Sequence, residues 1–338
     1  MPTRRGDTLI FTRPPTVGAF AAVGGKKESE GPLAACFDGL FQDNLLGQAS
    51  WEQAESVLQR ECLDRMLQKA GIPARKLSLV LAGDLQNQCT ASSYALRGVD
   101  VPFVGLYGAC STMAEALALA ACLAGTGLAD RAAALTSSHF CAAERQFRTP
   151  LEYGGKRTPT SQWTATAAGC CLVQPVGKGP AVRAVTFGRV QDYQITDVNN
   201  MGAAMAPAAA STLLHYLRDT GSDPAGFDAI YTGDLGLVGS RLLHQLLQKE
   251  GLCLPNHRDC GLLLYDPERQ QVQAGASGAG CSAAVLCGQV LPALCSGRMQ
   301  RVLFMSTGAL MSPTACQQGQ TIPSVAHLVE LAAGEVQP

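Results

Sequence analysis

The chain has 338 residues, of which 47% are hydrophobic and 16% charged, and its formal net charge is -1. A chain of this length can form two domains or one large one, and it can bury a substantial core. The composition contains no basic stripe of the kind that follows a phosphate backbone, which excludes nucleic acid as an expected partner.

The fourteen cysteines and the apolar segments indicate where the protein works. We expect no signal or transit peptide, because the arginine-containing start has no apolar segment behind it, and we therefore expect free thiols in a reducing compartment. The most apolar run, between Glu115 and Asp130, is interrupted by Gly125-Thr126-Gly127 and is too short to span a bilayer. We predict a cytoplasmic protein, or one bound peripherally to a membrane, without a transmembrane segment, a metal site or a cofactor.

The first elements with a clear pattern lie at 77–88 and 101–139. The run LSLVLAG is short, apolar and closed by glycine, as buried strands are. The second segment predicts a strand, a Gly-rich turn that holds Cys110, a helix that begins near Ser111, and a return strand that ends at TSSH.

The same pattern recurs in the second half of the chain, at 227–240 and 272–310. The matched positions are Gly83-Asp84 with Gly233-Asp234, Cys110-Ser111 with Cys281-Ser282, and Thr136-Ser137 with Ser306-Thr307. We predict an internal duplication with an N-terminal half at 1–175 and a C-terminal half at 176–338, joined at the linker PVGKGPA.

Strands that alternate with helices predict parallel pairing with right-handed crossovers. The fold class we predict is α/β, as a duplicated arrangement of layered mixed sheets that sandwich two central helices. The Ala, Gly and Ser content of those helices is what close packing between helix and sheet requires.

Cys110 is the first candidate functional residue because it opens a helix at the end of a strand, where α/β proteins bind ligands. The helix dipole lowers the pKa of a thiol in this position and favours the thiolate. Acyl transfer would also need a base and oxyanion donors, for which His139 and the backbone of Gly308 are the candidates. A purely structural role is the alternative for each of them.

The densest group of positive charges follows the first return strand, in SSHFCAAERQFRTPLEYGGKR at 137–157. Arg145 and Arg148 are three residues apart in a predicted short helix and can share one face. Arginine binds planar carboxylates in a bidentate manner, so this face is a candidate anion site. The alternative is a solvated face on which Glu144 and Glu152 pair with the arginines.

The duplication and the turn GACST resemble the thiolase superfamily, in particular the nucleophile turn of beta-ketoacyl-ACP synthases. A closer resemblance, over residues 8–330, is to the stage V sporulation protein AD family of spore-forming bacteria. The motifs that carry it include LAGDLQNQ, PFVGLYGACST, AERQFRTPLEYGG, TDVNNMGAAMAPAAA, TGDLGLVGS, GASGAGCSA and STGALMSPT.

This resemblance implies a thiolase-like protein that binds dipicolinate (pyridine-2,6-dicarboxylate), free or as its calcium chelate, and helps to move it into the developing spore. The implied partners are membrane-embedded transport proteins of the same operon at the spore inner membrane, and the superfamily implies a homodimer formed through edge strands. The ligand is a small planar dianion, so arginines and a helix N-terminus are expected contacts. The candidate ligand-binding residues are Cys110, His139, Arg145, Arg148, Asp234, Cys281 and Gly308.

The chain departs from the condensing enzymes of the superfamily, which pair the cysteine with a histidine and an asparagine (or a second histidine) from the second half. Here Cys281 stands where the asparagine is expected, and Gly233-Asp234 stands where the histidine is expected. A carboxylate would repel the negative charge that develops in an oxyanion hole. We therefore predict a binding protein that is not an enzyme. The alternatives are an acyl transferase that uses Cys110 and a structural scaffold for membrane partners.

Overall fold

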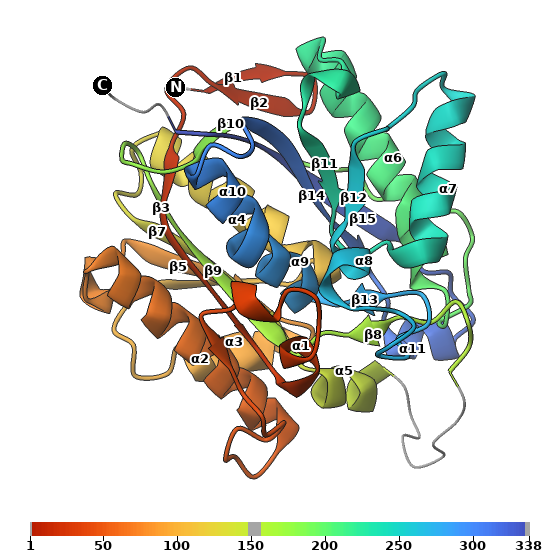
Figure 1. Ribbon diagram of the computed structural model, residues 1–338, viewed down its shortest axis with the longest axis horizontal. Coiled ribbons are helices and arrows are strands. Elements are labelled where there is room, and N and C mark those ends of the chain that lie inside the picture. The colour runs from red at the N-terminus through yellow and green to blue at the C-terminus, as the bar shows by residue number, and fades with distance from the viewer. Residues whose placement is uncertain (1, 148–156, 335–338) are drawn as a thin grey trace.

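The computed structural model describes residues 2–147 and 157–334, and one mixed sheet carries both halves of the chain (Figure 1). Along the sheet the strands follow the order β12-β11-β14-β15-β10-β3-β9-β7-β5-β6. The first half contributes β3 (Thr16–Gly24), β5 (Leu79–Gly83), β6 (Phe103–Leu106), β7 (Ala132–Ser138) and β9 (Ala167–Gln174). The second half contributes β10 (Ala181–Thr186), β11 (Ala229–Thr232), β12 (His257–Asp259), β14 (Arg301–Ala309) and β15 (Ser324–Ala332).

This strand order is symmetric about the point where β3 meets β10. In each half the inner strands pair antiparallel and the outer strands pair in parallel, so β5 corresponds to β11 and β7 to β14. Between the halves, β3 and β10 pair through Thr16 and Ala181. The predicted duplicated α/β fold with mixed sheets is confirmed.

Short strands connect the two halves outside this path. β1 (Pro2–Arg5) pairs with β2 (Thr8–Phe11), and β2 adds to β10 of the second half. β4 (Gly39–Leu40) pairs with β3, and β8 (Trp163–Thr164) forms a separate two-stranded sheet with β13 (Ala276–Ser277). The predicted linker joins β9 to β10. The division at 175/176 stays a prediction, because β2 and β8 each pair with a strand from the other half.

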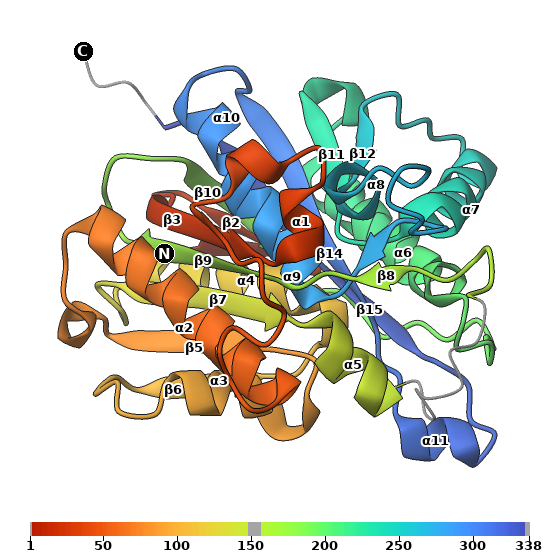
Figure 2. The same ribbon diagram turned by 60° about the horizontal axis from the view of Figure 1, so that its bottom comes forward.

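Helices form layers outside and between the two half-sheets (Figures 1 and 2). α2 (Trp51–Ala70), with α3 (Thr90–Ala95) beside it, packs on the first half-sheet, and α6 (Met201–Thr220), with α7 (Gly236–Lys249) beside it, packs on the second. The central helices are α4 (Thr112–Gly125), α9 (Ala279–Val285) and α10 (Leu291–Cys295). The short helices are α1 (Lys26–Ser29), α5 (Phe140–Phe147), α8 (Cys260–Leu264) and α11 (Pro313–Gln317).

The central helix α4 contacts β7 and β9 of the first half and β14 and β15 of the second, so it is covered on both sides. Its sequence TMAEALALAACLAG is apolar around most of its circumference, as a helix buried on all sides must be. The small alanine side chains let both sheets approach the helix closely. The predicted sandwich of central helices between sheets is therefore confirmed.

A close approach between the halves occurs at Gly169 on β9, where the strand meets α9. A Cβ at this position would lie 2.5 Å from the carbonyl oxygen of Ala283 and 2.8 Å from its Cβ. These atoms belong to the backbone or sit directly on it, so they cannot rotate away. Glycine at position 169 therefore allows the second-half helix to lie directly on the first-half strand.

We expect Gly169→Ala to destabilise the protein by about 1–3 kcal/mol, the usual cost of overpacking a dense core. Gly18→Ala in β3 is a matched control, because its Cβ would meet the mobile amide end of the Gln174 side chain. Urea denaturation of both variants measures the difference in the free energy of unfolding. Equal stabilities would show that the contact between α9 and β9 is looser than these distances indicate.

The parallel strands of both halves end at the same edge of the molecule, and the starts of α4, α6 and α9 lie near this edge. This arrangement brings segments from both halves together around one space. Within residues 2–147 and 157–334, we find no helix with the length and apolar character needed to cross a membrane.

Candidate functional site

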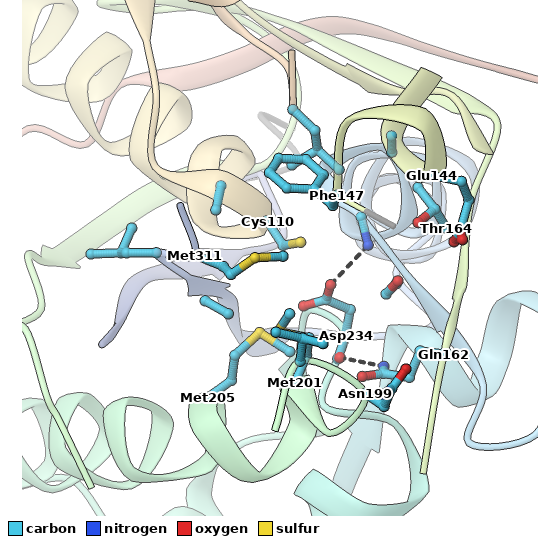
Figure 3. Close-up of a pocket in the computed structure, with 18 of the residues that line it drawn as sticks. Cys110, Glu144, Phe147, Gln162, Thr164, Asn199, Met201, Met205, Asp234 and Met311 are labelled. Carbon is cyan, nitrogen blue, oxygen red and sulfur yellow. Dashed lines mark hydrogen bonds between the residues drawn. The ribbon is translucent and has the colours of Figure 1, made fainter. Parts of the chain in front are cut away.

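A cavity of about 280 Å³ lies at the edge where the central parallel strands end (Figure 3). Its walls come from the segments that follow β5, β6, β7, β11 and β14 and from the starts of α4, α6 and α9. This is the edge at which α/β proteins bind ligands. The polar residues in its lining include Cys110, Glu144, Gln162, Thr164, Asn199, Asp234 and Ser312.

Cys110 faces the cavity from a strained turn at the start of α4. Ala109, the residue before it, has a φ of 52°, in the left-handed region that is unfavourable for residues other than glycine. The Ser111 hydroxyl donates to the carbonyl oxygen of Gly108 at 2.6 Å, and the Thr112 hydroxyl donates to that of Ala109 at 2.7 Å. These bonds hold the turn in the conformation that presents the thiol.

The carboxyl group of Asp234 lies beside Cys110 and is fully buried in the cavity wall. It accepts hydrogen bonds from the Gly278 N–H at 2.9 Å, from the Thr307 hydroxyl at 3.0 Å and from the Cys110 thiol. Burial raises the pKa of Asp234 to about 7, and the nearby Asp259 carboxylate acts in the same direction. The group is therefore close to half protonated at neutral pH.

Asp259 is a second buried carboxyl group, and it holds the turn that presents Asp234. It accepts hydrogen bonds from the backbone N–H groups of Leu235 and Gly236, each at 2.9 Å, and from the Thr232 hydroxyl at 2.6 Å. Burial raises the pKa of Asp259 to about 6. These bonds fix the backbone on the carboxyl side of Asp234, so its side chain has little freedom to leave the cavity wall.

The pKa of the Cys110 thiol lies well above its ordinary value, first because the site is buried and then because the Asp234 carboxylate is adjacent. This direction is opposite to the lowering that the helix dipole alone predicts. At neutral pH the residue is a protonated thiol, which is a weak nucleophile. No histidine lines the cavity in the part of the chain that the structure describes.

Gln162 lines the cavity, and both polar atoms of its side-chain amide are buried in the wall. Its Nε2 donates to the carbonyl oxygens of Asp234 at 2.7 Å and Ala276 at 2.8 Å, which fixes the side chain (Figure 3). Its Oε1 is buried and has no hydrogen-bond partner among the described residues. Leaving such an acceptor unpaired costs about 1–3 kcal/mol.

Glu144 brings a second carboxylate to the cavity wall, and Arg157 compensates its charge. The two groups are 2.9 Å apart and mostly buried. Arg157 also donates to the carbonyl oxygen of Gln162 at 3.1 Å, and its guanidinium lies 4.7 Å from the ring centre of Trp163 and 5.1 Å from that of Phe140. This guanidinium therefore holds the wall together rather than pointing into the open space.

The structure does not bring His139 to Cys110. His139 is fully buried, and its Nε2 donates to the carbonyl oxygen of Asn44 at 2.7 Å. Burial lowers the pKa of its imidazole, so the ring is neutral at pH 7. His139 does not line the cavity, and its hydrogen bond gives it a structural role instead of that of a base for the thiol.

Arg145 also lies outside the cavity lining, where it pairs with Glu52 at 3.3 Å and is half exposed. The reason is the rotation of α5: Ala143 and Phe147 are four residues apart and line the cavity, and Arg145 lies midway between them on the opposite side of the helix. The other predicted anion contact, Arg148, falls outside the described residues.

Cys281 and Gly308 support the cavity from behind its lining. Cys281 is fully buried in α9, with its thiol 3.8 Å from the carbonyl oxygen of Gly233. A Cβ at Gly308 would lie 2.4 Å from the carbonyl oxygen of Gly108 and 3.0 Å from the nitrogen of Ser111. Glycine at 308 therefore allows β14 to touch the turn that carries Cys110.

Other lining residues were not among the candidates that the sequence suggested. They include Leu85, Tyr107, Phe147, Gln162, Thr164, Asn199, Met201, Met205, Met311 and Ser312. The sequence offered one signal for the residues around α6, because asparagine is a common residue at the start of a helix. In the structure the side chain of Asn200 caps α6 by accepting from the Ala203 N–H at 3.3 Å. Gln162 gave no such signal, since its place depends on the pairing of β8 with β13.

Solved structures share this backbone arrangement. OleA from Xanthomonas campestris, in a cerulenin-bound crystal structure, is similar with a TM-score of 0.61 and 13% identity over 96% of this chain and 98% of that one. The 3-oxoacyl-[acyl-carrier-protein] synthase III from Aquifex aeolicus has a TM-score of 0.57 and 10% identity over 94% of this chain and 99% of that one. The duplicated layers thus define a thiolase-like fold, in which Cys110 opens the first central helix.

The sequence profile of stage V sporulation protein AD matches residues 5–332. Stage V sporulation protein AD of Bacillus subtilis (strain 168) is 41% identical over 322 residues, which cover 95% of each chain. The chain therefore belongs to the stage V sporulation protein AD family and has a role in sporulation, as the resemblance predicted.

Proposed function

We propose that this protein binds dipicolinate in the cavity beside Cys110 and takes part in moving it into the developing spore. The observation that carries the proposal is a cavity of about 280 Å³ at the ligand-binding edge of a sporulation-family protein. Ligand sites commonly measure about 300–1,000 Å³, so this volume suits a molecule with a single ring.

The lining suits both parts of such a molecule. The starts of α4, α6 and α9 lie at the cavity, and helix N-termini favour carboxylate groups. Apolar side chains, among them Leu85, Phe147 and Met205, offer contacts to the faces of an aromatic ring.

The calcium chelate fits this lining better than the free dianion. Among the described lining residues none is lysine, arginine or histidine, so none of these side chains supplies a cation to balance two negative charges. The carboxylate oxygens of Asp234 are donors of the kind that Ca²⁺ prefers. A chelate of one dianion with one Ca²⁺ is neutral and can place its metal ion beside these oxygens.

We further propose that the protein binds its ligand without chemical turnover. The support is the state of Cys110: its thiol donates to Asp234, and its pKa is raised by burial and by that carboxylate. Acyl transfer needs a thiolate and a base that can accept the thiol proton. The Asp234 carboxyl group, with a pKa of about 7, supplies negative charge beside the thiol, which disfavours the thiolate and an oxyanion formed next to it.

Isothermal titration of the purified protein with dipicolinate, with and without equimolar calcium, tests the proposal. We expect saturable binding of one ligand per chain and a higher affinity for the chelate. Benzene-1,3-dicarboxylate is the matched control ligand, because it has the same carboxylates but lacks the ring nitrogen that completes the chelate. The absence of saturable heat at millimolar concentrations of both forms of dipicolinate would contradict the proposal.

Within the same proposal, the protein passes its ligand to membrane-embedded transport proteins of the same operon and acts as a homodimer. The support for a dimer is β6, the last strand of the sheet, which has an open edge. Phe103, Val104 and Tyr107 on or beside it are 37%, 44% and 50% exposed, and Tyr94 nearby is 57% exposed. An apolar strip on an open strand edge suits pairing with the same strip of a second copy.

We expect Val104→Asp to convert the dimer to a monomer, because it places two like charges at the centre of a symmetric contact. Val190→Asp is the control, since Val190 is 60% exposed and belongs to the second half. Sedimentation velocity of the two variants measures the result. Dimers of unchanged affinity in Val104→Asp would place the contact elsewhere.

A further inference from the structure

A chain of hydrogen-bonded side chains leads from the exposed face of α7 to the cavity wall. Nε2 of His244 on α7 lies 3.1 Å from Nδ1 of His257 on β12. Nε2 of His257 lies 2.9 Å from the Thr232 hydroxyl oxygen, which lies 2.6 Å from Oδ2 of Asp259. The Asp259 carboxylate accepts from two backbone N–H groups of the turn that follows Asp234, each at 2.9 Å. The chain therefore ends on the backbone that presents Asp234 to the cavity.

The two ends of this chain lie in different surroundings. His244 is exposed and His257 is partly buried, whereas Thr232 and Asp259 are buried. Burial raises the pKa of Asp259 to about 6, so at neutral pH the group is mostly a carboxylate. Burial, followed by the charge of His244, lowers the pKa of His257 to about 4, so its ring is neutral.

These protonation states leave one direction for the hydrogen bonds. A threonine hydroxyl has a single hydrogen, and at Thr232 it is donated to the Asp259 carboxylate. Nε2 of His257 must therefore carry a hydrogen and donate it to the hydroxyl oxygen. Because a neutral imidazole has one N–H, Nδ1 of His257 is an acceptor, and Nε2 of His244 donates to it. Every bond of the chain points from the surface towards Asp259.

We propose that His257 is a positioning residue for the cavity wall and that His244 holds it in the required tautomer. Through this chain the exposed face of α7 is coupled to the contact between Asp234 and Cys110. Asp259 fixes the backbone that follows Asp234, whose carboxyl group accepts from the Cys110 thiol. Loss of a donor to Asp259 therefore loosens this contact. The coupling does not depend on which ligand the cavity takes.

The rate at which iodoacetamide alkylates Cys110, measured by peptide mass spectrometry, reports how firmly the turn is held. Thr232→Val removes the hydroxyl and keeps the shape of the side chain, so the Asp259 carboxylate loses its donor. Hydrogen bonds to charged groups are among the stronger ones in proteins, and we expect Cys110 to react about tenfold faster in this variant. Thr232→Ser keeps the hydroxyl and is the matched control, which should react at close to the native rate.

Variants of the two histidines test the direction of the chain. His257→Leu removes both bonds of the ring and should accelerate alkylation of Cys110 about as much as Thr232→Val. His257→Gln keeps an N–H donor near the position of Nε2 and should restore most of the native rate, which a role in filling space alone does not predict. His244→Ala should give a smaller increase, because His257 keeps its bond to Thr232 but loses the group that fixes its tautomer.

The imidazole nitrogen shifts of His257, measured by NMR spectroscopy of the native protein, check the tautomer directly. We expect a neutral ring with its hydrogen on Nε2. A neutral ring with its hydrogen on Nδ1 would overturn the proposal, since such a ring cannot donate to Thr232.

Cys62 on α2 is the internal control for the alkylation rates, because it is fully buried in the core of the first half. Global unfolding exposes both cysteines, whereas a loosened turn exposes Cys110 alone, so the comparison stays valid in a destabilised variant. An unchanged rate at Cys110 in Thr232→Val would overturn the proposal. Equal increases at Cys62 and Cys110 would also overturn it, because the hydroxyl would then support the fold as a whole and not the turn.

Discussion

Replacing Asp234 with histidine is expected to make Cys110 react with iodoacetamide at least about tenfold faster at neutral pH, because each unit by which a thiol pKa falls raises the thiolate fraction about tenfold. In the native protein burial and the Asp234 carboxylate together raise the pKa of this thiol well above its ordinary value. An imidazole at the same position removes the negative charge and can accept the thiol proton. The helix dipole of α4 then favours the thiolate, and burial is the remaining effect that opposes it.

Alkylation of the peptide that contains Cys110, followed by mass spectrometry, distinguishes this thiol from the other cysteines of the chain. Asp234→Asn is the matched control, because it removes the charge without supplying a base and should give a smaller increase. Equal rates in the native protein and Asp234→His would show that burial alone controls the thiol. The role that we assign to Asp234 in suppressing the nucleophile would then be wrong.

The parts of the fold and site that could be predicted are those that the internal repeat marks. Cys110 and Asp234 each follow a strand of a repeated unit, and parallel strands end at one edge of a sheet, so both residues could be assigned to the same region. The structure places both in one cavity wall. The duplicated layers follow from the same repeat, since each copy supplies a strand, a central helix and a return strand.

The predicted role of Arg145 as an anion contact depended on the rotation of one short helix. The spacing of residues fixes which side chains share a face, but it does not say which face meets the cavity. In the structure Ala143 and Phe147 line the cavity, and the guanidinium of Arg145 lies 4.7 Å from the ring centre of Trp51 on α2. That contact joins residues far apart in the chain, which no local pattern can reveal.

His139 was predicted to belong to the site and does not line the cavity, whereas Gln162 was not predicted and does line it. His139 directly follows the strand β7, as a base for Cys110 would, but a hydrogen bond to the distant Asn44 holds its ring. Gln162 has no counterpart in the repeat, yet it lines the cavity because β8 pairs with β13. For both residues a tertiary contact decides whether the side chain lines the cavity. The residue type alone therefore favours His139, which lies outside the lining, over Gln162, which belongs to it.

Filling the cavity is expected to abolish dipicolinate binding, with Ala309→Trp weakening the affinity by more than about 100-fold, or more than about 2.7 kcal/mol. Ala309 ends β14, is partly exposed and lines the cavity of about 280 Å³, so an indole ring would project into the space that the ligand needs. Since the added atoms enter open space, the melting temperature should stay close to that of the native protein.

Ala225→Trp is the control for this variant, because Ala225 is exposed in the turn before β11, at the opposite ends of the strands from the cavity. It makes the same chemical change without touching the cavity and should bind normally. Calorimetry with the calcium chelate measures both variants. Normal binding by Ala309→Trp would mean that dipicolinate does not occupy this cavity. Selective loss in Ala309→Trp would place the calcium chelate beside Cys110.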